Sequence, residues 1–104
     1  MLYTTTPEYP GRQITEVLGV ARGSTVRARN IGRDIFAGLK NLVGGEISEY
    51  TKLMADSREE ALFRMIADAE RMGADAVVNM RITTAAVMNG ASEILAYGTA
   101  VKLS

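Results

Sequence analysis

The stretch Ser48–Thr83, SEYTKLMADSREEALFRMIADAERMGADAVVNMRIT, changes its hydrophobic period at Gly73. Before this glycine, apolar side chains share one stripe of a helix: Tyr50, Met54, Ala61, Met65 and Met72, widened by Leu62 and Ala69. After it, apolar and polar residues alternate, as in a half-buried strand. We therefore predict a long helix over Ser48–Met72, ended by Gly73, and a strand beyond it.

The N-terminal half is predicted to hold a strand and a shorter helix. Residues 13–21 are rich in β-branched side chains, and the pair Gly23-Ser24 marks the expected end of the strand. Over residues 30–43 the apolar positions return to helical spacing, with Asn30 as the N-cap. The pattern thus predicts a strand followed by two helices.

A hairpin is predicted at Asn89-Gly90, because both central positions of a type I′ turn need positive φ. A two-residue turn would place Ile82 opposite Tyr97, on an apolar sheet face that receives the long helix. The other face would carry a nearly flat strip of small residues in the last strand, which is expected over Ser92–Leu103: Ala96, Gly98 and Ala100.

The predicted fold is a two-layer α+β domain, with a small antiparallel sheet of three strands packed by one long helix and one short helix. The chain has 104 residues, which is room for a single domain over 1–104. Residues 1–12 are predicted to form an irregular arm, since Pro7, Pro10 and Gly11 interrupt any regular run.

Composition limits the compartment and the function classes. The chain has no cysteine, which fits a reducing compartment and excludes disulfides. Its N-terminus has no signal-peptide pattern, and no apolar run reaches the roughly 20 residues that a bilayer requires. We expect a cytoplasmic protein without a membrane partner.

The charge is balanced overall but unevenly placed. Twelve basic and twelve acidic residues give a formal net charge of zero, so no nucleic-acid partner is expected. Residues 1–45 have an excess of basic side chains, and residues 46–75 an excess of acidic ones. The acidic block is interpreted as a solvated helix face, or as a surface that meets the basic part of another subunit.

Most catalytic signatures are missing. Without His or Cys, the chain has no His-based triad, cysteine nucleophile or His-ligated zinc site. Residues 19–25 are weakly similar to a phosphate loop but lack its lysine, so a turn that ends the strand is the better interpretation. Glu59 and Glu60 are adjacent in a helix and point in different directions, which disfavours a carboxylate site.

Two features admit a functional interpretation. Arg33-Asp34 sits in an otherwise apolar helix, either as a structural or intersubunit ion pair or as a polar anchor in a ligand pocket. The six methionines offer thioether sulfur for Cu(I), but those on the long helix lie on its apolar stripe, so core filling explains them better.

The run NIGRDIFAGLKNLVGG at residues 30–45 resembles the YbjQ-like family, a bacterial and archaeal group labelled as a heavy-metal-binding domain. The similarity extends over nearly the whole chain. It includes Thr5-Thr6-Pro7, Ile14, Gly19-Val20, Gly73-Ala74-Asp75-Ala76-Val77-Val78 and Gly98-Thr99-Ala100-Val101. The resemblance implies a dodecin-like subunit that assembles into a ring, with a pentamer expected. It supplies no activity, and the lack of Cys and His disfavours a heavy-metal site.

The ring implied by the resemblance would explain several odd features as contacts between subunits. Two glycines in the short helix cost about 1 kcal/mol each, and Phe63 lies opposite the apolar stripe of the long helix. The residues predicted to contact another subunit are Gly32, Gly38, Phe63, Arg81, Ala96, Gly98 and Ala100.

Three hypotheses follow. The first is a non-enzymatic homo-oligomer for binding or scaffolding, which holds a metal ion or a small organic ligand between subunits; Asn30, Arg33 and Asp34 are the predicted pocket residues. The second is an enzyme with carboxylates and arginines at a subunit junction. The third is nucleic-acid binding by a basic ring face, which would need Arg27, Arg29 and Arg33. The sequence does not identify a cofactor.

Overall fold

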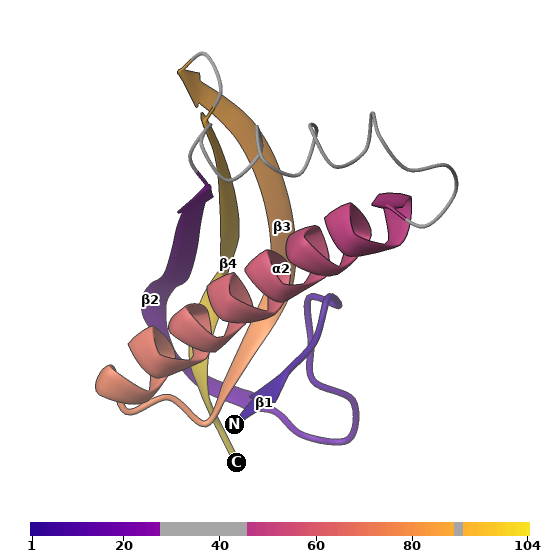
Figure 1. Ribbon diagram of the computed structural model, residues 1–104. Helices are drawn as coiled ribbons and strands as arrows, with labels where there is room; N and C mark the ends of the chain where they lie inside the picture. The colour runs from indigo at the N-terminus through magenta and orange to yellow at the C-terminus, as the bar shows by residue number, and fades with distance from the viewer. Residues whose placement is uncertain (28–45, 89–90) are drawn as a thin grey trace.

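The computed structural model describes residues 1–27, 46–88 and 91–104. Its strands form one sheet in the order β1-β3-β4-β2, and helix α2 crosses one face of that sheet (Figure 1). The predicted α+β class, with one long helix on a small sheet, is confirmed. The predicted short helix at residues 30–43 lies outside the described residues. The elements are β1 (Leu2–Tyr3), β2 (Ile14–Arg27), α2 (Glu46–Arg71), β3 (Ala76–Met88) and β4 (Ala91–Leu103).

The sheet is mixed, so the prediction of a purely antiparallel sheet with three strands is wrong. In the arm that was predicted to be irregular, Leu2 and Tyr3 pair in parallel with Ala76 and Val77 of β3. The backbone amide of Thr4 then donates to the carbonyl of Val77 at 2.9 Å. A strand of two residues is too short to produce an alternating pattern, which is why the sequence did not indicate it.

Strand β2 does not end at Gly23-Ser24 as predicted; it continues to Arg27 in antiparallel pairing with β4. Gly23 does not form a turn; it allows α2 to pack closely on β2. A Cβ atom built on Gly23 would lie 2.2 Å from the backbone nitrogen of Met65 and 2.5 Å from the carbonyl oxygen of Ala61. The backbone of α2 therefore rests directly on β2 at this residue.

The predicted register of the hairpin is wrong by one residue. Ile82 pairs with Ala96, and Tyr97 pairs with Arg81. The register shifts between Ala86 and Met88, next to the turn, and this shift displaces the partner of Ile82. It shifts again between Val78 and Arg81, where Asn79 has a φ of 54°, a left-handed conformation that asparagine tolerates better than most residues. A single extra residue reverses the faces of a strand, because side chains alternate with a period of two.

The faces of β4 are consequently reversed relative to the prediction. The small residues Ala96, Gly98 and Ala100 are buried, and both alanines belong to the core under α2. Tyr97 is on the opposite face and 37% exposed. The strip of small residues is thus the surface on which α2 packs, and its small side chains allow the helix to approach the sheet closely.

The core has two parts on opposite faces of the sheet. The larger part lies under α2 and confirms the predicted helix stripe over Ala61–Ala69, while Met72 at the helix end is 36% exposed. A smaller cluster on the other face is covered by Tyr9 and Ile14. The larger cluster comprises Ala21, Ala61, Leu62, Met65, Ala69, Val77, Ile94, Ala96 and Ala100, and the smaller one Ala76, Val78, Val101 and Leu103.

Over the described ranges, no helix combines the length and apolar character that a bilayer crossing needs.

Candidate functional site

The residues predicted to form a ligand pocket, Asn30, Arg33 and Asp34, lie outside the described residues. The same holds for two of the predicted subunit contacts, Gly32 and Gly38. These assignments stay predictions.

The other predicted subunit contacts fall into three structural situations. Phe63 is 71% exposed on the outer side of α2. The Arg81 guanidinium donates to the carbonyl oxygens of Thr5 and Met80, both at 2.8 Å, so this side chain holds the N-terminal arm within the chain. The three small residues of β4 are buried under α2. The prediction that they contact another subunit assumed that they form an exposed strip, and in the structure of the chain they do not.

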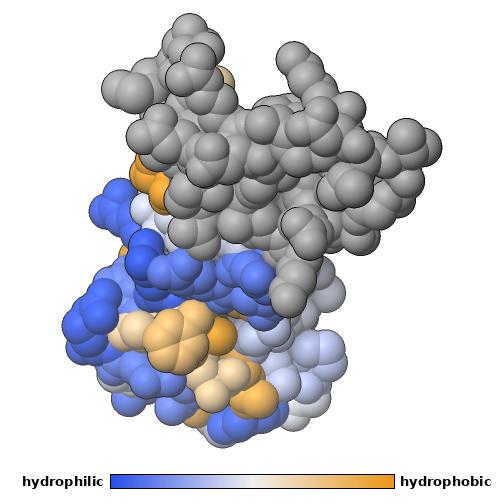
Figure 2. All heavy atoms as spheres, viewed as in Figure 1, coloured by the Kyte–Doolittle hydropathy of each residue, from blue (hydrophilic) through white to orange (hydrophobic). Residues whose placement is uncertain are grey.

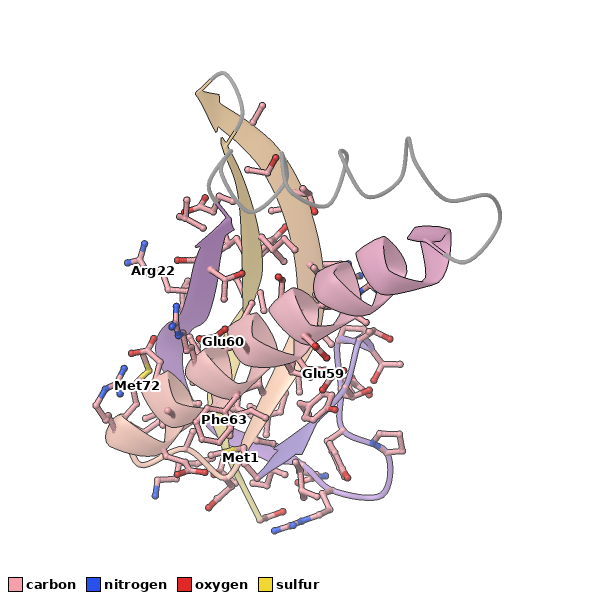
Figure 3. All side chains as sticks on the ribbon, viewed as in Figure 1. Met1, Arg22, Glu59, Glu60, Phe63 and Met72 are labelled. Atoms are coloured by element: carbon pink, nitrogen blue, oxygen red, sulfur yellow. The ribbon has the colours of Figure 1, made fainter. Side chains whose placement is uncertain are left out.

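An apolar patch lies on the same face of the molecule as Phe63. Figure 2 shows apolar atoms gathered on the face that carries α2, amid hydrophilic ones, and Figure 3 shows Phe63 on this helix in the same view. Met1, Leu2 and Tyr3 are each about 40% exposed. Phe63 is therefore the most exposed of the large apolar side chains that the described residues leave open to water.

A basic groove runs between the edge strand β2 and the C-terminal half of α2. We call it the arginine groove; it has a volume of about 330 Å³. The spacing of Arg64, Ala67 and Arg71 places these residues on one side of the helix, and Figure 3 shows Arg22 projecting at the same edge of the molecule. The lining is Arg22, Gly23 and Ser24 from β2, Arg64, Ala67 and Arg71 from α2, and Leu95 from β4.

Asp68 connects the two walls of the arginine groove. One carboxylate oxygen accepts the backbone N–H of Arg22 at 3.0 Å, and the other accepts the guanidinium of Arg71 at 3.0 Å. The hydrogen bond from the Arg22 amide, assisted by the nearby charge of Arg71, holds the pKa of Asp68 below its ordinary value, although partial burial opposes the shift. Asp68 is therefore ionised at neutral pH.

Arg64 makes the second connection across the groove. Its guanidinium donates to the carbonyl oxygen of Ser24 at 2.6 Å and also pairs with Glu60, which precedes it by four residues on the same helix. Arg64 and Asp68 thus bond two backbone groups of edge strand β2 that face away from β4. Such capping protects an edge strand from pairing with other chains at that point.

The arginine groove was not among the sites predicted from the sequence. One signal was present, because the 64, 68 and 71 spacing places Arg, Asp and Arg on one face of the predicted helix. The contribution of Arg22 could not be found, because that residue was expected just beyond the predicted end of its strand.

The donor atoms do not fit a heavy-metal site in the part of the chain that the structure describes. The whole sequence lacks Cys and His, and no three Asp or Glu side chains of the described residues gather closely enough to hold an ion. Among the methionines, Met65 is buried in the core and Met80 packs against it. Thiolate and imidazole are the usual ligands of such metals, and thioethers inside a core do not replace them.

These features define a class of protein: a small α+β domain whose described surface presents an apolar patch and a basic groove. The family model YbjQ_1, described as "Putative heavy-metal-binding", matches residues 1–104, and the chain belongs to this family.

Curated relatives and one solved structure agree with this assignment. A UPF0145 protein of Archaeoglobus fulgidus is 59% identical over 103 residues, which cover 99% of this chain and 95% of the relative. A UPF0145 protein of Photobacterium profundum is 60% identical over 103 residues, which cover 99% of this chain and 100% of the relative. A crystal structure from Pediococcus pentosaceus, titled as a protein of unknown function of the DUF74 family, has a TM-score of 0.65 at 18% identity, covering 100% of this chain and 98% of that one. At this identity the likeness shows the fold alone.

Proposed function

We propose that the chain is a subunit of a homo-oligomeric binding or scaffolding protein without enzymatic activity, with a pentameric ring as the assembly implied by its family resemblance. The observation that carries this proposal is the 71% exposure of Phe63 on a face of the molecule that shows an apolar patch. Burying one such side chain contributes about 1.5–3 kcal/mol, so a partner that covers the patch gains substantially.

A second exposed apolar surface supports a ring over a two-fold dimer. Val20 and Val26 of β2 are 56% and 55% exposed. They pair with Thr99 and Glu93 of β4, and therefore lie on the sheet face opposite α2. Phe63 is on the helix layer, so the two surfaces belong to different sides of the chain. Contact between unlike surfaces of successive copies is the arrangement that generates rings.

The test is the mass of the native assembly, measured by light scattering and native mass spectrometry at micromolar concentration. We expect the wild-type chain to be an oligomer. Phe63→Ser should raise the dissociation constant of the assembly at least about tenfold, which corresponds to a loss of about 1.4 kcal/mol of association free energy. Glu59→Ser is the matched control, because Glu59 is an exposed neighbour on the same helix. A wild-type monomer, or equal behaviour of the two variants, would refute the proposal.

For the ligand, a small organic molecule is favoured over a metal ion. The described residues supply guanidinium groups and apolar surface in one groove, and they supply no suitable set of metal donors. The same native mass spectra, recorded on protein purified without chelators, test both. A retained organic mass supports the proposal, and a stoichiometric metal ion would contradict it.

A further inference from the structure

We propose that the arginine groove binds the phosphate group of a small organic molecule, with the apolar part of that molecule against Ala67. This inference deepens the binding role proposed above and does not depend on the number of subunits.

The balance of charge in the groove favours an anion. Arg22, Arg64 and Arg71 line it, whereas the carboxylates that pair with them are those of Glu60 and Asp68. Among the described residues, the guanidinium of Arg22 makes no hydrogen bond or ion pair, since the bond from Arg22 to Asp68 uses the backbone amide. One full positive charge therefore remains for a ligand.

The two carboxylates orient the arginines more than they neutralise the groove. Both oxygens of Asp68 are engaged, one with the Arg22 amide and one with Arg71. Arg64 is fixed by the carbonyl of Ser24 as well as by Glu60. Guanidinium groups held in place lose less rotational freedom when they bind an oxyanion, and their planar fork matches phosphate oxygens.

The dimensions and lining indicate a small ligand. A volume of about 330 Å³ is at the lower end of small-molecule sites. Ala67 is half-buried and gives the helix side of the groove an apolar surface. The zero net charge of the chain disfavours a nucleic acid as the occupant.

The experiment is a calorimetric and NMR titration of the full chain at low ionic strength, where exposed charges are least screened. The probes are inorganic phosphate, phenyl phosphate and acetate. We expect phenyl phosphate to bind severalfold more tightly than inorganic phosphate, because its ring contacts the apolar surface at Ala67, and acetate to bind more weakly than either. The amide signals of Arg22, Gly23 and Ser24 should shift.

The decisive variant is Arg22→Gln, with Arg58→Gln as its control. Arg58 is an exposed arginine of α2 and is not part of the groove lining. Each variant loses one positive charge, so the two differ only in where the charge is removed. Arg22→Gln should weaken phenyl phosphate binding about tenfold, as for the loss of one charge-assisted hydrogen bond, while Arg58→Gln leaves it unchanged. The thermal midpoint and sedimentation of each variant separate this loss from misfolding or a change of assembly.

Three outcomes would overturn the inference. They are an absence of binding by either phosphate probe at millimolar concentration, an equal loss in both variants, and stronger binding of a short RNA without a terminal phosphate than of phenyl phosphate. If the chain proves monomeric yet binds phenyl phosphate through Arg22, the oligomer proposal fails and this inference stands.

Discussion

Replacing Gly23 with alanine tests whether close contact between α2 and β2 holds the two layers together. A methyl group at this position would lie 2.2 Å from the backbone nitrogen of Met65 and 2.5 Å from the carbonyl oxygen of Ala61. Both atoms belong to the helix backbone, so no side-chain rotation relieves the overlap. The helix must move away from the sheet by about 1 Å to restore ordinary contact.

The cost of this movement follows from the residues beneath the helix. Ala21, Ala61 and Met65 are fully buried between the layers, and a gap of 0.5–1 Å forfeits about a quarter to a half of each dispersion contact. The bonds from Arg64 and Asp68 to β2 would lengthen as well. We expect Gly23→Ala to lower the free energy of unfolding by about 3 kcal/mol, the upper part of the range for overpacked cores.

Urea denaturation followed by circular dichroism measures this loss, with Ser24→Ala as the control. Ser24 is the next residue of the same strand, and its contact with Arg64 uses the backbone carbonyl, which alanine retains. The control should remain within about 0.5 kcal/mol of the wild type. If Gly23→Ala proves as stable as Ser24→Ala, the helix does not rest on β2 as described.

Three further substitutions test the bulge, the groove and the core. Asn79→Val should cost about 1–2 kcal/mol in urea denaturation because of the φ of 54°, whereas Asn79→Gly should be close to the wild type. Asp68→Asn should cost about 1 kcal/mol at neutral pH by the same measurement. Because the folded-state pKa of Asp68 is lowered, its contribution is present above the ordinary value of 3.8 and is lost as the pH falls below it, so wild type and variant should converge there. Met65→Ala should cost about 3 kcal/mol by creating a cavity in the core, and a smaller loss would show that the core collapses around it.

The long helix and the hairpin strands could be predicted from the sequence because their patterns are long. Ala61, Leu62, Met65 and Ala69 repeat at helical spacing, and the structure buries them all. The stop at Gly73, which has a φ of 79°, is close to the observed helix end at Arg71. Exposure of Phe63 also followed from its place opposite this stripe.

The register could not be predicted, because it depends on two local shifts in the pairing of β3 with β4. An Asn-Gly turn with regular pairing places Ile82 opposite Tyr97, and the register shift between Ala86 and Met88, next to the turn, changes that pairing and reverses the faces. The shift at Asn79 then displaces the pairing again for the first residues of β3. Likewise, Gly23 has the sequence signature of a turn and serves as a contact surface for a helix. Both cases are decided by tertiary packing, which a local pattern does not contain.

The arginine groove illustrates the same limit for a site. The helical spacing of Arg64, Asp68 and Arg71 can be read from the sequence, but the strand that completes the groove is far away in the chain. Arg22 joins them only because Gly23 lets the two layers meet. The predicted pocket residues at positions 30, 33 and 34 lie outside the described residues and stay untested.

Strand β1 has a kinetic consequence. Leu2 and Tyr3 can pair with Ala76 and Val77 only after the rest of the chain has brought them together, and such non-local contacts form late in folding. With only two residues, β1 is also the element that local opening should release first. Native-state hydrogen exchange should therefore be faster at Thr4 than along the β2–β4 ladder, and each opening would briefly expose the outer edge of β3.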